Sequence, residues 1–303
     1  MKLVLDRLQS LRARGVWPGG ARDLWTDALG VLCLLNLHSE MEEMRYLEEA
    51  QVVALNVDRI LGRRKGICLG EGPESEGQTF RSLALWIYAL RTLGEYRPHF
   101  RLRALSLVRE IHSSFVRPGS GIVTRMDENL RAPFPGAETG KVEVFLGFGV
   151  YRLLDEGALA PEVEEMEGLV GRACASLAPD QGLDLGLLLW ITHFFPGEGW
   201  AVNLRERCLS ALDARWILPP GYFRRNLPEP RVAPHRPDIL ALTNLTTAIG
   251  LRAHGIWAER TDRIQRYFLE NYAWEDPEDP LSSILTCVSL LPGVLLARHA
   301  TTP

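Results

Sequence analysis

Residues 23–63, DLWTDALGVLCLLNLHSEMEEMRYLEEAQVVALNVDRILGR, contain two helical segments of opposite character joined by a short link. Residues 23–37 are apolar on nearly every side, whereas residues 41–63 carry charged side chains along one face. A helix that is apolar all round must be enclosed by protein, and a helix with a polar stripe must face water on that side. The stretch therefore predicts a hairpin made of an inner and an outer helix.

The same alternation continues along the chain, and strand-like runs with a period of two are almost absent. Further inner helices are expected at residues 77–94, 141–154, 183–195, 238–253 and 281–291. Further outer helices are expected at residues 99–116, 161–177, 200–212 and 259–272. Six inner helices thus alternate with five outer ones, and the amphipathic residues 1–15 supply a twelfth helix that can close the ring against the last inner helix.

The sequence therefore predicts an all-α fold, an (α/α)6 toroid of about twelve helices in inner and outer layers, with residues 1–303 as a single barrel domain. A two-domain helical bundle and an open solenoid are the alternatives, although neither end resembles the polar capping repeat of a solenoid. Links from outer to inner helices include three long ones, at residues 64–76, 117–140 and 213–237. Because links of one class lie at the same end of successive hairpins, we expect the functional site at the end that carries these loops.

Composition excludes several classes of partner. A formal net charge of -4 and a pI near 6.0 give no overall basic field, so no nucleic-acid partner is expected.

The five cysteines are odd in number and lie far apart, which is typical of reduced thiols in a cytoplasmic protein. Residues 1–15 are interrupted by charges and do not resemble a secretion signal. Residues 281–297 are slightly short for a membrane span and contain Pro292, which favours a buried helix and no membrane partner.

Four segments carry a resemblance to a known family. They are LWTDALGVLCLL (24–35), ICLGEGPESEGQTFRSLALWIYAL (67–90), RMDENLRAP (125–133) and DILALTNLTTAIGL (238–251). Together with the helix pattern, they make the chain similar to the six-hairpin glycosidase-like proteins, notably a bacterial branch of them. The resemblance implies a twelve-helix barrel with a cleft at one end, where carboxylates often act on carbohydrate.

The most specific part of the resemblance is an acid-x-acid-Gly-Gln motif, carried here by Glu74, Glu76 and Gln78, that leads into a helix. Two positions depart from the family pattern. Arg81 stands where an aromatic-flanked histidine is expected, and Glu143 stands where relatives have a short motif containing aspartate. Because the fold serves hydrolases, lyases and epimerases, it does not decide the reaction.

Most of the predicted inner helices begin with a carboxylate. These residues are Asp23, Asp27, Glu76, Glu143, Asp184, Asp238 and Asp279. An acid in the first turn accepts hydrogen bonds from free amides, and we interpret Asp23, Asp184, Asp238 and Asp279 as helix caps. Asp27 and Glu143 lie about a turn further inside apolar segments, where an unpaired carboxylate is costly. Each either meets an arginine or amide or lines a wet central funnel.

Glu71, Glu74 and Glu76 crowd the loop before the second inner helix. They are either a solvated loop or part of an active site, because neighbouring carboxylates raise one another's affinity for protons and one of them can then act as an acid. Glycoside chemistry uses such an acid with a second carboxylate that acts as a base or nucleophile. We assign Glu76 as the acid and Asp27 or Glu143 as the second carboxylate.

The loop at residues 213–237 combines aromatic residues with several arginines, which suits a sugar bearing a carboxylate or phosphate. The same arginines could instead pair with the acidic loop at residues 71–76, and RNA binding is a weaker third interpretation. The predicted substrate contacts are Trp25, Glu74, Gln78, Arg81, Arg125, Arg225 and Asp238.

No metal site and no cofactor are expected, because no histidine pair has zinc-ligand spacing and neither CxxC, GxGxxG nor a phosphate-binding lysine motif occurs. The leading hypothesis is a cytoplasmic carbohydrate-active enzyme, similar to glycoside hydrolases, that acts on a small-molecule or oligosaccharide substrate and in particular an acidic sugar. The alternative is a non-catalytic ligand- or protein-binding scaffold on the same ring. The sequence leaves the glycan, the stereochemical outcome and the oligomeric state open.

Overall fold

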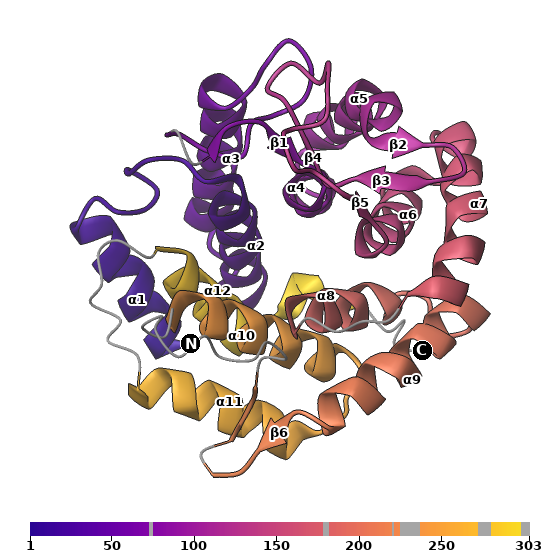
Figure 1. The fold of residues 1–303 in the computed structure, drawn as a ribbon. Coiled ribbons are helices and arrows are strands. Elements are labelled where there is room, and N and C mark those ends of the chain that lie inside the picture. The colour runs from indigo at the N-terminus through magenta and orange to yellow at the C-terminus, as the bar shows by residue number, and fades with distance from the viewer. Residues whose placement is uncertain (73–74, 178–181, 220, 225–236, 272–279, 298–303) are drawn as a thin grey trace, which may run out of the picture. The chain divides into compact units, whose positions relative to one another are not determined.

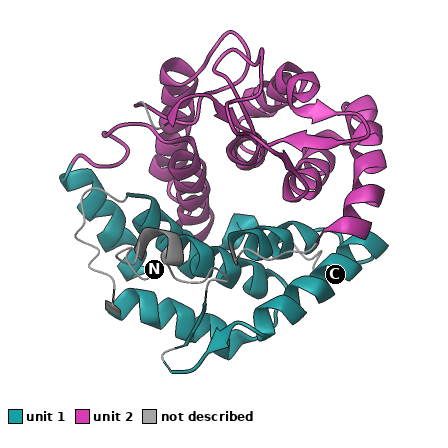
Figure 2. Ribbon diagram, viewed as in Figure 1, with its two compact units in different colours: residues 1–14, 178–303 teal, residues 15–177 magenta. Residues whose placement is uncertain are grey.

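The computed structural model describes residues 1–72, 75–177, 182–219, 221–224, 237–271 and 280–297. The described part of the chain is mainly helical (Figure 1). It divides into two compact units, one formed by residues 15–177 and the other by residues 1–14 and 178–303 (Figure 2).

The unit of residues 15–177 consists of three helix pairs. The bounds of its helices are α2 (Leu24–Met41), α3 (Met44–Ile60), α4 (Phe80–Leu93), α5 (Pro98–Phe115), α6 (Val142–Asp155) and α7 (Ala160–Ser176). Helix α4 packs against both α2 and α6, and each of these three helices also packs against the helix that follows it in the chain. The helices α2, α4 and α6 are buried on nearly all sides, whereas α3, α5 and α7 bury one face only. This unit therefore has the inner and outer layers predicted from the sequence.

Short strands connect the loops that precede α4 and α6. Their bounds are β1 (Gln78–Thr79), β2 (Val116–Arg117), β3 (Gly121–Val123), β4 (Arg125–Met126) and β5 (Thr139–Gly140). Strand β1 pairs antiparallel with β4, so that Thr79 lies opposite Arg125, and β3 pairs with both β2 and β5. The backbone amide of Phe80 also donates to the carbonyl of Thr124. These pairings fix the loop of residues 117–140 against the N-terminal end of α4.

The second unit repeats the helix pairs. Its elements are α1 (Lys2–Ala13), α8 (Gly182–Thr192), α9 (Gly199–Asp213), β6 (Trp216–Ile217), β7 (Tyr222–Phe223), α10 (Pro237–Ala253), α11 (Ala258–Asn271), α12 (Pro280–Leu290) and a short 3-10 helix (Gly293–Leu295). Helix α10 packs against α8 and α12, and α1 packs against α12. A Cβ atom at Gly186 would lie 2.7 Å from the backbone nitrogen of Thr247, and one at Gly250 would lie 2.7 Å from the Cβ of Leu189. Glycine at these two positions therefore lets α8 and α10 approach closely.

Among the described helices, none combines the length and the apolar character that a span of the bilayer requires.

Candidate functional site

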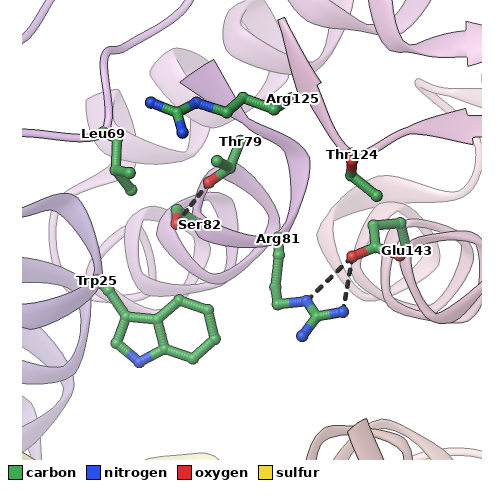
Figure 3. Close-up of a pocket in the computed structure, with 8 residues that line it drawn as sticks. All are labelled: Trp25, Leu69, Thr79, Arg81, Ser82, Thr124, Arg125 and Glu143. Atoms are coloured by element: carbon green, nitrogen blue, oxygen red, sulfur yellow. Dashed lines mark hydrogen bonds and ion pairs between the residues drawn. The ribbon is translucent and has the colours of Figure 1, made fainter. Parts of the chain in front are cut away.

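A pocket of about 430 Å³ lies in the unit of residues 15–177 (Figure 3). The residues that line it are Trp25, Leu69, Thr79, Arg81, Ser82, Thr124, Arg125 and Glu143. They come from the first turns of α2, α4 and α6 and from the loops that precede α4 and α6. The pocket thus lies where the sequence predicts a site, beside the long loops that lead into the inner helices.

The central polar contact of the pocket is the ion pair between Arg81 and Glu143. The Nε and Nη2 atoms of Arg81 donate to the same carboxylate oxygen, Oε1 of Glu143, at 3.0 Å and 2.7 Å. The Glu143 side chain is only 5% exposed, whereas the Arg81 side chain is 23% exposed. The structure pairs Glu143 with an arginine, which is one of the two alternatives that the sequence left open, and the carboxylate also lines the described pocket.

Gly140 makes room for the Glu143 carboxylate. A Cβ atom at position 140 would lie 1.9 Å from Oε2 of Glu143 and 2.8 Å from the Cγ2 atom of Thr124. Strand β5 is held in this place by its pairing with β3, where Gly140 lies opposite Ile122. Only a residue without a side chain is therefore compatible with the observed position of the carboxylate.

Arg125 forms another part of the pocket wall. Its guanidinium lies over the ring of Phe134, 3.9 Å from the ring centroid. Its Nε and Nη2 atoms both donate to the backbone carbonyl of Glu76, the former at 3.0 Å. The pairing of β1 with β4 thus brings Arg125 and the main chain of the acidic loop together at the start of α4.

Trp25 supplies an aromatic surface to the pocket. Its side chain is half-buried, and its indole nitrogen is buried with no hydrogen-bond partner among the described residues. In Figure 3 the six-membered ring of Trp25 points towards Arg81. A half-buried indole that lines a pocket suits stacking on a sugar ring.

Asp27 occupies a separate, buried cluster and does not line the pocket. Its Oδ1 atom accepts hydrogen bonds from Nε1 of Trp17 and Nη1 of Arg22, both at 2.9 Å, while Oδ2 is buried without a partner among the described residues. Burial raises the pKa of Asp27 to about 6, although the Arg22 guanidinium and the Trp17 hydrogen bond act in the opposite direction. The structure therefore places Asp27 with an arginine, which is one of the two alternatives that the sequence allowed.

Gln78 is fully buried and ties three segments together. Its Oε1 atom accepts from the amide of Ile67 at 2.8 Å, and its Nε2 atom donates to the carbonyls of Lys65 and Glu128, both at 2.9 Å. The pocket lining does not include Gln78. The structure gives this residue a supporting place behind the pocket wall.

The acidic loop does not bring its carboxylates together in the described residues. Glu76 is exposed, with its backbone carbonyl bound by Arg125, and Glu71 accepts a hydrogen bond from the amide of Arg22 at 2.7 Å. Glu74 lies outside the described residues. The structure thus places Glu76 next to a pocket residue through its main chain, while its side chain faces solvent.

The remaining predicted residues lie elsewhere. Asp23 caps α2, because its Oδ1 atom accepts from the amide and the hydroxyl of Thr26, both at 2.8 Å. Asp238 lies in the first turn of α10, in the other unit, and its side chain is outside the described residues. Arg225 and Asp279 also lie outside them. No three His, Cys, Asp or Glu side chains in the described ranges cluster so that they could hold a metal ion.

Sequence reasoning did not single out Leu69, Thr79, Ser82, Thr124 or Gly140. Thr79 and Ser82 flank Arg81 in the chain, so the start of the predicted helix at residues 77–94 was the available signal for them. Thr124 and Gly140 enter the site through strand pairs of only two or three residues. Such strands are too short to show an alternating pattern in the sequence.

No known protein family matches the chain as a whole or in part, and no curated protein matches it. Solved structures do match. The GH76 α-mannanase of Bacteroides thetaiotaomicron has a TM-score of 0.69 at 9% identity over 97% of this chain and 95% of the mannanase. The cellobiose 2-epimerase of Spirochaeta thermophila has a TM-score of 0.62 at 12% identity over 90% of this chain and 86% of the epimerase. A D-mannose isomerase has a TM-score of 0.64 at 12% identity over 91% of this chain and 87% of the isomerase.

The chain has the (α/α)6 toroid fold. These structures confirm the predicted fold class and, at the level of fold, the resemblance to the six-hairpin glycosidase-like proteins. Within the toroid, the described pocket lies at the first turns of three inner helices, α2, α4 and α6. At identities of 9–12% this similarity shows the fold only. The reaction therefore has to be inferred from the residues of the site.

Proposed function

We propose that this protein is a carbohydrate-active enzyme whose substrate pocket is the one lined by Trp25, Arg81 and Glu143. The observation that carries the proposal is a buried carboxylate, Glu143, that lines a pocket together with an indole ring. The fold supports it, since a mannanase, a sugar epimerase and a sugar isomerase share this toroid. The five cysteines are free thiols, which agrees with the proposed cytoplasmic location.

In this proposal Glu143 acts as the base or nucleophile. Its pairing with Arg81 provides two charge-assisted hydrogen bonds to the ionised form. An ionised carboxylate can accept a proton from water or from a sugar carbon, or attack an anomeric carbon. Both of these Arg81 nitrogens contact Oε1 of the carboxylate.

Glu76 remains our candidate for the acid. Hydrolysis needs a second carboxylate within about 5–9.5 Å of the first, depending on the stereochemical outcome. The main chain of Glu76 is fixed to the pocket wall by Arg125, and its exposed side chain can rotate. Glu74, Arg225 and Asp238 keep their proposed roles as substrate contacts. Asp27 and Gln78 are better suited to support the pocket walls, because both are buried and hydrogen-bonded outside the lining.

The test compares two glutamates that differ in their relation to the pocket. Purified wild type, Glu143→Gln and Glu138→Gln are incubated with a panel of oligosaccharides and monosaccharides, and products are separated by chromatography. Glu138 is exposed and does not line the pocket, and its substitution changes the net charge equally. We expect turnover by wild type and Glu138→Gln, and a loss of roughly 100-fold or more in Glu143→Gln. Absence of both binding and turnover with every sugar would contradict the proposal.

A non-catalytic binding scaffold is the second candidate. Glu143 is the single carboxylate among the lining residues in the described part of the chain, and its charge is matched by Arg81. Such a pocket can bind a ligand without transforming it. Binding of a glycan by wild type, with no product formed and with Glu76→Gln and Glu143→Gln binding equally well, would favour the scaffold.

A further inference from the structure

Arg22 links the buried acid Asp27 to the acidic loop. Its Nη1 atom donates to Oδ1 of Asp27 at 2.9 Å, and its Nη2 atom donates to the carbonyl of Pro18 at 2.6 Å. Its main chain is bound to Glu71, because its amide donates to Oε2 of Glu71 at 2.7 Å and its carbonyl accepts from the amide of Glu71 at 2.9 Å. The side chain of one residue thus contacts the acid while its main chain contacts the loop.

The contact between these segments extends to the lining of the pocket. Residues 22–24 run antiparallel to residues 69–71, and an antiparallel bridge joins the central residues of the two stretches. The amide of Leu24 donates to the carbonyl of Leu69 at 2.8 Å. Leu69 lines the pocket, as does Trp25, and in the view of Figure 3 both lie on the same side of it. The position of this wall therefore depends on how residues 22–24 are held.

Asp27 and Arg22 form a buried ion pair with unsatisfied atoms. Their side chains are 1% and 6% exposed, and Oδ2 of Asp27 and Nε of Arg22 have no hydrogen-bond partner among the described residues. Burial raises the pKa of Asp27 to about 6. The Arg22 guanidinium and the Trp17 hydrogen bond oppose this rise, and the charge of Asp23 adds to it. The folded protein therefore takes up a proton at Asp27 in mildly acidic solution.

This protonation removes the counter-charge of Arg22. A buried guanidinium beside a neutral acid is poorly solvated, and a long arginine side chain reaches water when it turns outward. An outward turn breaks the hydrogen bonds of Arg22 to Asp27 and to the Pro18 carbonyl. The stretch of residues 22–24 then loses the side chain that anchors it, and the pocket wall that it supports is less well ordered.

We propose that Asp27 is a positioning residue whose ionised form, acting through Arg22, holds Leu69 and Trp25 in the arrangement that binds a sugar. The affinity of the pocket for sugar therefore falls as Asp27 takes up a proton. This inference rests on the proposed function, since it assigns a control of sugar binding to the same pocket. All residues in it belong to the unit of residues 15–177.

The first experiment measures the affinity of wild type for glucose, mannose and cellobiose between pH 4.5 and pH 7.5, by titration calorimetry. We expect the affinity for a sugar that binds to fall roughly fivefold from the upper to the lower end of this range. The midpoint of the fall should lie close to the Asp27 pKa of about 6. Because the coupling is reciprocal, a saturating sugar should move this midpoint to lower pH.

Two variants separate the charge of Asp27 from its packing. Asp27→Asn keeps the shape and an acceptor oxygen but cannot ionise, so its affinity should be weak and independent of pH. Trp17→Phe removes an N–H group that favours the ionised form, so its midpoint should move to higher pH. Asp6→Asn is the control, because Asp6 is exposed and lies in the other unit, and it should keep the wild-type profile. The melting temperature of each variant shows whether it is folded.

A measurement without sugar tests the link between Asp27 and the pocket wall by itself. The methyl NMR signals of Leu69, assigned by their absence in Leu69→Ile, are followed over the same pH range. They should shift with a midpoint near pH 6 in wild type and stay constant in Asp27→Asn.

Each other outcome contradicts a stated part. Sugar affinity of wild type that does not change with pH contradicts the inference and leaves the proposed function standing. A pH profile that Asp27→Asn retains, or a midpoint that Trp17→Phe leaves unchanged, contradicts the role of ionised Asp27. Absence of binding of all three sugars at every pH contradicts the proposed function and the control of sugar affinity together. Constant Leu69 signals in wild type contradict the link between Asp27 and the wall, whether or not a sugar binds.

Discussion

Glu143 receives two hydrogen bonds from Arg81 on one carboxylate oxygen, and its other oxygen lies against Gly140. The carboxylate is thus held by the charge of Arg81, and the lack of a side chain at position 140 leaves room for its second oxygen. Both features act on the residue that we propose for catalysis, and each can be tested by its own substitution.

The ion pair predicts a measurable coupling between the two residues. Glu143 is buried and Arg81 is mostly buried, so removing one partner leaves the other charge poorly solvated. We expect a double-mutant cycle of Arg81→Gln and Glu143→Gln, measured by urea unfolding, to give a coupling energy of about 1–3 kcal/mol. Strictly additive effects of the two substitutions would show that the pair contributes nothing to stability.

Gly140→Ala should displace the Glu143 carboxylate, because the added methyl group would overlap Oε2. We expect a loss of turnover together with a stability cost of roughly 1–3 kcal/mol. Gly168→Ala is the matched control, since position 168 lies in α7 and a Cβ there meets nothing within 4 Å. That substitution should leave activity intact and raise the free energy of unfolding by about 0.5–1 kcal/mol. Full activity of Gly140→Ala would remove the positioning role of this glycine.

Asp27 predicts a specific dependence of stability on pH. Its pKa rises on folding from 3.8 to about 6, so between these pH values the folded protein holds a proton that the unfolded chain releases. Stability from this group is therefore fully present below about pH 4 and is lost as the pH rises through about 6, with a total of about 3 kcal/mol.

Urea unfolding between pH 4 and pH 7 measures how the free energy of unfolding changes with pH. Asp27→Asn should remove the part of this pH dependence that comes from Asp27, whatever its effect on the free energy of unfolding at any one pH. Asp6→Asn, an exposed substitution of the same charge, should keep the wild-type slope. Parallel curves for wild type and Asp27→Asn would show that Asp27 titrates alike in the folded and unfolded chains.

Asp23 predicts a capping effect at the start of α2. Asp23→Ala removes the acceptor for the amide and hydroxyl of Thr26, and should lower the free energy of unfolding by about 0.5–2 kcal/mol. Asp23→Asn retains an acceptor oxygen and should lose much less. If alanine and asparagine cost the same in thermal or urea unfolding, the hydrogen bond to Thr26 is not the source of stability.

The layers of the fold could be predicted from the sequence because burial on all sides leaves a strong signal. Residues 24–37 are mostly apolar and their few polar side chains form no continuous stripe, and such a helix has to be enclosed by protein. The outer helix that follows shows its solvent-facing side equally clearly. The organisation of residues 1–303 as one barrel domain stays a prediction.

The site could be predicted in part. A carboxylate one turn inside an apolar helix indicates either a paired or a functional group, and this was correct for both Asp27 and Glu143. The sequence could not show that Glu143 lines the pocket whereas Asp27 does not, because the surroundings of each carboxylate depend on which arginine lies nearby. Asp27 is met by Arg22 from the segment just before its own helix, whereas Glu143 is met by Arg81 from a neighbouring helix. Such partners depend on tertiary packing, which helical periodicity does not encode.

The buried side-chain amide of Gln78 joins backbone groups of two other segments, at residues 65–67 and at Glu128. A substitution of Gln78, for example by leucine, would leave the amide of Ile67 and the carbonyls of Lys65 and Glu128 without this hydrogen-bond partner. The segments that these bonds hold together would then be less well ordered. Laboratory evolution of ligand preference should therefore accept changes at Trp25 or Ser82 readily, while position 78 should stay invariant among the surviving clones.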